Sequence, residues 1–243
     1  NDADAFKELM AERHDEIAAV ILEPIPHSVG AIIPTKEFLK TLRRETKTYG
    51  SLLIFDEIIT AFRHNIHGIQ KEFGVIPDIT TIGKSMGNGY PIAAIVGKRE
   101  VMSMIHNGVL VSGTYSGHPS GLAATKKTIE ILERDKVIDY ISKLGEEYRK
   151  ALVDLIEDLS ITARVVGYKS IFAVQFAEGE VKDYSSIVGI DKERFKRFAA
   201  EMRKRGIFFT PNPMKRCHLC LAHTDKEMNE FLDAASEVLR LFK

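Results

Sequence analysis

The sequence is poor in the features that mark secreted, membrane-spanning and nucleic-acid-binding proteins. Its 243 residues include only two cysteines, too few for a disulfide framework. Lysine plus arginine equals aspartate plus glutamate, at 34 each, so no charge excess favours nucleic acid or an anionic membrane. No apolar run approaches the roughly 20 residues that cross a bilayer, and the acidic start at Asn1–Asp4 lacks a signal-peptide pattern. We therefore expect a cytoplasmic protein with no nucleic-acid or membrane partner.

The composition that remains is ordinary for a globular protein, with 44% hydrophobic and 28% charged residues and enough length for one or two domains. Over the first two-thirds of the chain, short apolar runs alternate with helical patterns. This alternation predicts an α/β fold with a mostly parallel sheet. The strands are expected at 18–22, 52–55, 79–82 and 92–96, with a helix over 35–49 between the first two.

A long amphipathic segment begins at Val137, and the pattern after it differs from the pattern before it. We place the domain boundary in this segment, which gives an α/β domain over 1–140 and a small α+β domain over 141–243. The second domain is expected to contain a strand pair joined through Gly167, a last strand and two helices, at residues 162–166, 171–176, 217–222, 195–202 and 228–242. A capping box at Thr224–Glu227 would begin the last helix.

Three of the predicted strands end in ionisable residues, namely Glu23, Asp56 and Lys84. The carboxyl ends of parallel strands meet at one edge of a sheet, where ligands bind in open α/β folds. A carboxylate and a lysine brought to that edge form either a structural ion pair or a catalytic pair. The segment Gly83–Pro91 surrounds Lys84 with glycines, which allows the backbone to approach a bound group, although it lacks P-loop spacing.

Two longer segments carry a resemblance to a known family. Leu53–Arg63 and Phe73–Lys84 closely resemble the signature of the class III aminotransferases, and within them the glutamate-1-semialdehyde 2,1-aminomutase branch. The pair Glu23-Pro24, the segment 112–117 and the segment 221–224 are similar to further elements of the same family. The resemblance implies part of the large domain of a fold-type-I transferase that uses pyridoxal 5′-phosphate (PLP), followed by the small C-terminal domain.

The same resemblance implies roles for individual residues. Lys84 would form a Schiff base with PLP and later carry the proton between the substrate and the cofactor. Asp56 would pair with the pyridine nitrogen and keep it protonated. Ile58 would pack against the ring of the cofactor.

Further positions are expected around the cofactor. Thr114, supported by Ser112 and Gly113, would bind the cofactor phosphate of a neighbouring subunit, so a dimer would form part of the site. Glu23 and Ser28 complete the expected set. No metal ligand is expected among these residues.

The expected activity is amino-group transfer between a small-molecule donor and a carbonyl acceptor. Alternatives are a 1,2-aminomutase and a non-catalytic partner subunit. Class III enzymes carry a long stretch before the Glu-Pro strand, so we expect a homodimer, or a hetero-oligomer with a separate chain that supplies this N-terminal half. Ser28 and the pair Lys215-Arg216 stand where the aminomutase branch has an asparagine and an acidic segment. A basic pair predicts a substrate with a carboxylate or phosphate.

Two weaker signals lie outside the family motifs. Cys217-His218-Leu219-Cys220 has the spacing of half a zinc site but no second ligand cluster, so packing in a strand is the favoured interpretation. Strand alternation would place Cys217 and Leu219 on one face and the other two residues on the opposite face. His118 is either a pocket residue near Thr114 or a loop histidine.

Overall fold

The computed structural model describes all 243 residues, and they form two compact units. The first unit contains Asn1–Pro24 and Pro34–Ile138, and the second contains Ile25–Ile33 and Asp139–Lys243. The domain ranges 1–140 and 141–243 expected from the sequence stay a proposal. None of the helices combines the length and the apolar character needed to cross a bilayer.

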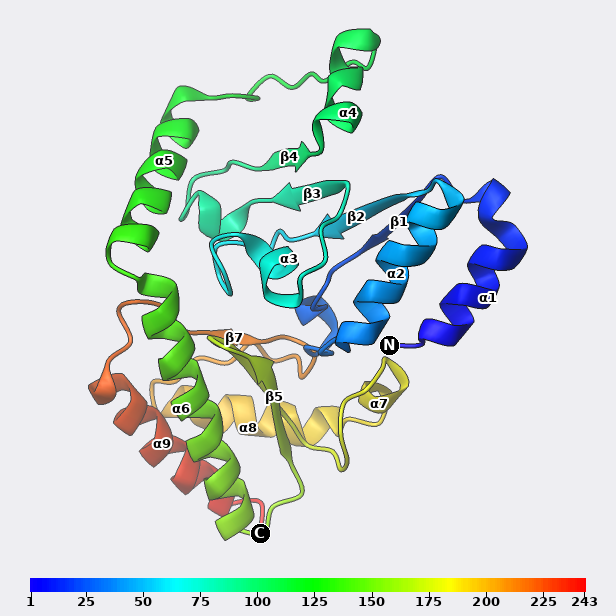
Figure 1. The fold of residues 1–243 in the computed structure, drawn as a ribbon. Helices are drawn as coiled ribbons and strands as arrows, with labels where there is room; N and C mark the ends of the chain where they lie inside the picture. The colour runs from blue at the N-terminus through cyan, green and yellow to red at the C-terminus, as the bar shows by residue number, and fades with distance from the viewer. The chain divides into compact units, whose positions relative to one another are not determined.

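A four-stranded sheet with the order β1-β2-β3-β4 forms the centre of the first unit (Figure 1). Its strands are β1 Ala19–Leu22, β2 Leu52–Asp56, β3 Ile79–Ile82 and β4 Ala94–Gly97. The first three strands are parallel and close to their predicted positions. These pairings confirm the predicted α/β fold with a mostly parallel sheet.

The fourth strand differs from its predicted position, and it is the strand that makes the sheet mixed rather than fully parallel. Strand β4 begins two residues later than the predicted 92–96 and pairs antiparallel with β3. Between β3 and β4 the chain contains only a single 3-10 turn and a second reversal, in which the Tyr90 N–H donates to the Gly87 carbonyl at 3.1 Å. A parallel pairing needs a long crossover, usually through a helix, so this short connection favours the antiparallel direction.

The first unit also contains five helices, and the helix expected over 35–49 is present as α2. The helices are α1 Ala3–Arg13, α2 Lys36–Tyr49, α3 Gly68–Phe73, α4 Arg99–Met102 and α5 Pro119–Arg134, with 3-10 turns η1 His14–Glu16, η3 Lys84–Met86 and η4 Ser103–Asn107. The Thr35 side chain accepts from the Phe38 N–H and begins α2, and Gly50 ends it at a positive φ of 76°. Its buried face packs on β2 through Leu39, Leu42, Leu53 and Phe55.

A buried carboxylate joins the amino ends of β2 and β3 to their neighbours. Asp78 accepts hydrogen bonds from the Leu53 N–H at 2.8 Å, from Arg43 at 2.8 Å and from Lys98 at 2.7 Å. Burial by itself would raise the pKa of Asp78, but these three donors outweigh it and lower the pKa. The ionised Asp78 therefore stabilises the sheet.

The second unit has a three-stranded antiparallel sheet, ordered β5-β6-β7. Its elements are β5 Arg164–Tyr168, β6 Ile171–Gln175, β7 Cys217–His218, η2 His27–Val29, α6 Val137–Asp158, α7 Ser185–Val188, α8 Lys192–Lys204 and α9 Asp225–Arg240. The predicted strand pair and both predicted helices are confirmed, and so is the capping box that begins α9. Two details were wrong, because β7 has two residues rather than six and Gly167 lies inside β5.

The position of Gly167 has a steric reason. Here a Cβ would overlap the Ile171 carbonyl on the paired strand, so a glycine is required for the close approach. The reversal itself lies at Lys169 and Ser170, and Lys169 has a positive φ of 49°. A glycine needed for packing thus has the same sequence signal as a turn glycine.

Aromatic residues from three helices and the sheet form the core of the second unit. The rings of Tyr148, Phe172 and Phe231 contact one another, with centroids 5.4 to 6.2 Å apart. Further buried residues of this core are Leu144, Leu152, Ile156, Val174, Phe176, Phe195, Phe198, Ala199, Met202, Phe209, Ala235, Val238 and Leu239. These side chains continue the apolar stripes predicted for α6, α8 and α9.

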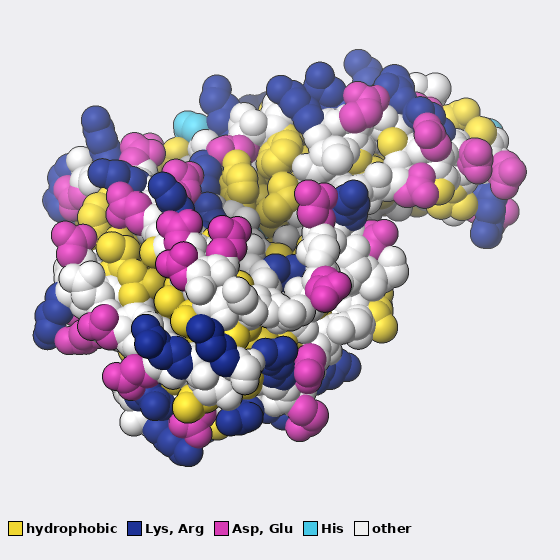
Figure 2. All heavy atoms as spheres, turned by 90° about the horizontal axis from the view of Figure 1, so that it is seen from below, with side chains coloured by type: hydrophobic (Ala, Val, Ile, Leu, Met, Phe, Trp, Pro, Cys, Tyr) yellow, Lys and Arg dark blue, Asp and Glu magenta, His cyan; other side chains and the backbone are white.

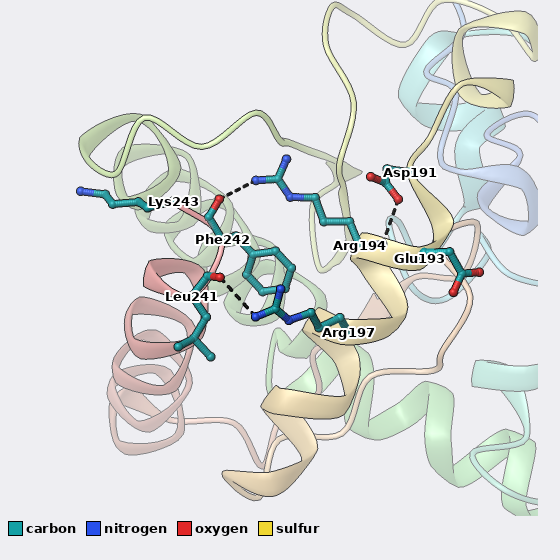
Figure 3. Close-up of a pocket in the computed structure, with 7 residues that line it drawn as sticks. All are labelled: Asp191, Glu193, Arg194, Arg197, Leu241, Phe242 and Lys243. Atoms are coloured by element: carbon teal, nitrogen blue, oxygen red, sulfur yellow. Dashed lines mark hydrogen bonds between the residues drawn. The ribbon is translucent and has the colours of Figure 1, made fainter.

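The hollow drawn in Figure 3 is a helix-end contact. Arg194 and Arg197 of α8 donate to the carbonyls of Phe242 and Leu241, just after α9, at 2.8 and 3.4 Å. Both guanidinium groups also lie over the Phe242 ring, 5.6 and 4.9 Å from its centroid. Cations at a helix C-terminus stabilise the helix dipole, so this hollow has a structural explanation. Elsewhere, Figure 2 shows basic and acidic side chains interspersed on the visible face, as zero net charge predicts.

The Asp78 contacts generate a stability prediction. Asp78→Asn should lower the free energy of unfolding by about 2 kcal/mol near pH 7, because the charged hydrogen bonds are lost. The depressed pKa of Asp78 makes its contribution present above the unfolded value of 3.8 and lost as pH falls through the lower folded value. Urea unfolding of both proteins between about pH 7 and pH 3 measures the difference.

The matched control is Asp4→Asn. Asp4 pairs with Lys7 at 2.7 Å, but its side chain is 85% exposed, so Asp4→Asn should leave the free energy of unfolding nearly unchanged. A destabilisation by Asp78→Asn that stays constant over the whole pH range would contradict the assigned role.

Candidate active site

The carboxyl ends of β2 and β3 bring one acidic residue into a fixed position. Asp56 ends β2 and pairs in register with Thr81 of β3. Its Oδ1 accepts from the Thr81 hydroxyl and from the Ile58 N–H, both at 3.1 Å. The side chain is half-buried, on the face that alternates with the buried residues of β2. Asp56 is therefore a carboxylate held by neutral donors.

Lys84 follows β3 at the same edge of the sheet and begins the turn η3. Its φ is +45°, a left-handed conformation that is uncommon and costly for a residue other than glycine. The side chain is exposed, and its ammonium group takes part in none of the ion pairs and hydrogen bonds of the chain. Backbone strain of this kind clusters at functional sites, so Lys84 is a candidate on structural grounds.

Two glycines pack the backbone around Lys84 tightly. At Gly83 a Cβ would lie 3.2 Å from Ile58 Cδ1 and 3.4 Å from the Cβ of Ala93. At Gly87 it would lie 2.6 Å from the Tyr90 carbonyl oxygen, which a side chain cannot tolerate. Gly83 thus places Ile58 directly beside the residue that precedes Lys84.

The predicted phosphate residues line a separate cavity of the first unit. Gly113, Thr114 and His118 contribute to it, and its volume is about 630 Å³. The opposite wall is formed by 90–93, which includes the Ala93 that contacts Gly83. His118 lines this cavity together with Thr114, and any role of these residues stays a prediction.

The remaining predicted residues divide between the two units. Glu23 is half-buried and directly follows β1, whose last residue Leu22 pairs with Phe55 of β2, so it reaches the same edge as Asp56. Ser28 lies in η2 and belongs to the second unit, as do Lys215 and Arg216. Glu23, Asp56, Ile58 and Lys84 therefore follow neighbouring strands at one edge of the sheet of the first unit, and Ser28 is not among them.

One residue of this region was missed by the sequence analysis. Glu57 is fully buried, and burial raises the pKa of its carboxyl group although backbone and hydroxyl donors oppose the shift. The signal was present in the sequence, because Leu53, Phe55 and Glu57 share the buried face of an alternating strand. A carboxyl group on the buried face of a strand is costly unless it is hydrogen-bonded, so its position indicates a specific role.

The cysteine pair follows the predicted alternation. Cys217 packs on the core and Leu219 is buried, while His218 and Cys220 are exposed. The Cys220 sulfur lies 3.3 Å from Nδ1 of His223. No group of three or more His, Cys, Asp or Glu residues is arranged to hold a metal ion.

The chain is similar to known proteins over almost its whole length. A family model described as Aminotransferase class-III matches residues 2–239. A glutamate-1-semialdehyde 2,1-aminomutase from Methanothrix thermoacetophila is 39% identical over 100% of this chain and 55% of its own length. An ω-transaminase structure from Sphaerobacter thermophilus is 31% identical, with a TM-score of 0.91 over 98% of this chain and 55% of its own.

A third similar protein is an amine transaminase from an uncultivated Pseudomonas species, solved in its PLP-bound form. It is 26% identical, with a TM-score of 0.84 over 98% of this chain and 55% of its own. The chain therefore spans about half the length of the relatives it matches.

The two cysteines generate a reactivity prediction. Burial raises the pKa of the Cys217 thiol to about 12, whereas Cys220 is exposed. In the folded protein a thiol reagent such as DTNB should react with Cys220 at least about a hundredfold faster than with Cys217, because the thiolate is the reacting form. Cys220→Ser should remove the fast phase and Cys217→Ser should keep it. Equal rates in the folded protein would refute the assignment.

Proposed function

Because the chain belongs to the class III aminotransferase family, we propose that the protein containing it transfers an amino group between a small-molecule donor and a carbonyl acceptor, with PLP as its cofactor. The observation that carries this proposal is the placement of Asp56 and Lys84 at one edge of two neighbouring strands. A carboxylate held by neutral donors and an unpaired amine on strained backbone are the two groups that this chemistry requires.

The residues at this edge fit the cofactor. When bound, PLP supplies an electron sink for charge that develops at the α-carbon of a substrate. Asp56 would accept a hydrogen bond from the pyridine nitrogen, and its negative charge would favour the protonated nitrogen. The Lys84 amine would hold the cofactor covalently and, once released, would move the substrate α-proton. Ile58, beside Gly83, would contact the cofactor ring.

A second copy of the chain is the proposed partner for Thr114. Residues 109–111 and Tyr115 form an apolar exposed segment around Gly113 and Thr114, with Leu110 88% and Tyr115 81% exposed. Exposed apolar segments of this kind mark interaction sites. We propose that this segment, called the 109–115 segment below, is buried in a homodimer, where Thr114 and Gly113 bind the cofactor phosphate of the other copy.

The remainder of the site is proposed to lie in polypeptide outside these 243 residues, since the relatives are longer than the chain. The expected separate chain for the N-terminal half stays a prediction, which co-purification would test. Glu23 stays a proposed cofactor neighbour because it reaches the edge of Asp56. Ser28 stays a prediction from the resemblance alone.

A second candidate function is a 1,2-aminomutase, because the curated relative from Methanothrix carries that name. Amino transfer that proceeds without an external acceptor would favour it. The pair Lys215-Arg216 supports a substrate with a carboxylate or phosphate in either case, and Arg216 donates to His218 at 3.2 Å.

Lys84→Ala in the complete protein should abolish the visible absorbance of the bound cofactor and lower activity at least about a thousandfold, because the amine is the proposed proton carrier. Borohydride reduction of the wild-type protein should leave PLP on the peptide that contains Lys84, read by mass spectrometry. Asp56→Asn should keep this attachment but lower activity about a hundredfold or more, since the ring nitrogen loses its anionic partner. Lys71→Ala, at an exposed lysine of α3, is the control and should behave as wild type. Attachment of PLP at a different lysine would overturn the proposed function.

The dimer proposal has its own variant. Leu110→Glu should shift the protein from dimer to monomer in light scattering, because a charge would be buried in the 109–115 segment. Val188→Glu, at a residue of α7 that is 63% exposed, is the matched control and should leave the mass unchanged. A dimer that persists at low micromolar concentration with Leu110→Glu would refute this interface.

A further inference from the structure

Glu57 follows Asp56 directly, and its side chain points to the opposite, buried side of the strand. Its Oε2 accepts from the Ile69 N–H at 2.6 Å and from the Thr60 hydroxyl at 3.0 Å. Thr60 lies in the loop between β2 and α3, 3 residues further along the chain, and Ile69 lies in the first turn of α3, 12 residues further along. One carboxyl group therefore connects both ends of this loop to the end of β2.

The loop is built closely around this carboxyl group. Gly68 has a φ of +72°, and a Cβ there would lie 2.7 Å from Cδ of Glu57 and closer still to one of its oxygens. The Ala61 N–H donates to the Glu57 carbonyl at 3.0 Å, and the Gly68 N–H donates to the Asn65 carbonyl at 3.0 Å. Any residue larger than glycine at position 68 would displace Glu57.

Ile58, the first residue of this loop after Glu57, makes two contacts in the proposed site. The Ile58 N–H donates to Asp56 Oδ1, and the Ile58 side chain lies beside Gly83. Ile58 lies in the chain between Glu57 and Thr60, and the Thr60 hydroxyl donates to the Glu57 carboxyl group. The Glu57 N–H also donates to the Thr81 carbonyl at 3.0 Å, and the Thr81 hydroxyl donates to Asp56. The backbone that orients Asp56 and Ile58 is thus fixed on its far side by Glu57.

We propose that Glu57 is a positioning residue that sets the orientation of Asp56 and Ile58 through the loop from Glu57 to Ile69. This inference rests on the proposed function, because it assigns Glu57 a role in presenting Asp56 to the cofactor. Glu57 itself does not touch substrate or cofactor in this role. Its contribution is to preserve the hydrogen bond from the Ile58 N–H to Asp56 Oδ1, which holds the Asp56 carboxylate in a single orientation.

The test compares Glu57→Ala with Glu57→Gln in the complete, cofactor-loaded protein. Glutamine keeps an oxygen that can accept from Ile69 and Thr60, whereas alanine removes it. Glu57→Ala should raise amide hydrogen exchange at Ile58 and Ile69 about tenfold, in keeping with the loss of buried hydrogen bonds. It should also shift the pH midpoint of the cofactor absorbance, because Asp56 no longer faces the ring nitrogen in one orientation. Glu57→Gln should restore both values to near wild type.

Gly68→Ala perturbs the same contact from the other side and should reproduce both changes with Glu57 intact. Glu72→Ala is the matched control, since Glu72 accepts from Asn65 of the same loop at 3.2 Å and should leave both values unchanged. If Glu57→Ala does not fold, Glu57→Asp replaces it, because the shorter side chain withdraws the carboxyl group from Ile69.

A purely structural role would lower the melting temperature of the alanine variant while leaving Ile58 exchange and the absorbance midpoint at wild-type values, and that result would overturn the inference. Failure of the proposed function has a different signature. In that case the wild-type protein would show no Lys84-dependent absorbance at all, while the exchange at Ile58 and Ile69 would still respond to Glu57.

Discussion

The parallel pairing of β2 with β3 is the constraint on which the candidate site depends. Its register places Asp56 opposite Thr81 and Ile54 opposite Ile79. Because side chains alternate along a strand, a slip of one residue would turn Asp56 into the core and Glu57 outward. The register is fixed by Leu53 and Phe55, both fully buried against α2. The apolar core of the first unit therefore determines which of two adjacent carboxylates reaches the open edge.

Burial separates the chemistry of these two carboxylates. Asp56 is half-buried, and its Oδ1 receives hydrogen bonds from two neutral donors, the Ile58 N–H and the Thr81 hydroxyl. Glu57 is fully buried, and burial raises the pKa of its carboxyl group. Glu57 instead accepts hydrogen bonds from the Ile69 N–H and the Thr60 hydroxyl, on the side of the strand away from Asp56. Asp56 and Glu57 are adjacent acidic residues, but their side chains lie on opposite sides of the strand, one half-buried and the other fully buried.

Sequence patterns identified the elements whose signal is apolar periodicity and missed features that depend on close contacts. Strands β1 to β3 were predicted because each is a short run of mostly apolar residues, and helices α2, α8 and α9 because their apolar residues repeat at helical spacing. Gly167 misled the prediction, because a glycine needed for close strand contact resembles a turn glycine. The direction of β4 depends on how the short connection after Lys84 folds, which periodicity does not encode.

The candidate site shows the same division. Asp56, Ile58 and Lys84 were identified through the resemblance of a long motif, and the structure brings Asp56 and Lys84 to one edge. The φ of +45° at Lys84 could not be foreseen, since no sequence rule favours lysine in a left-handed conformation. Strain of this kind costs about 1 to 3 kcal/mol and persists only where surrounding contacts impose it. Around Lys84 the Met86 N–H donates to the Gly83 carbonyl at 3.1 Å and the Gly87 N–H donates to the Lys84 carbonyl at 3.0 Å.

The candidate residues of the chain are divided between its two units. The candidate cofactor residues Asp56, Ile58 and Lys84 all lie in the first unit, whereas the basic pair Lys215-Arg216 lies in the second. Relatives with very similar folds carry different names, an aminomutase in one case and an ω-transaminase in another. Since fold similarity does not distinguish substrates, their selection must depend on individual side chains.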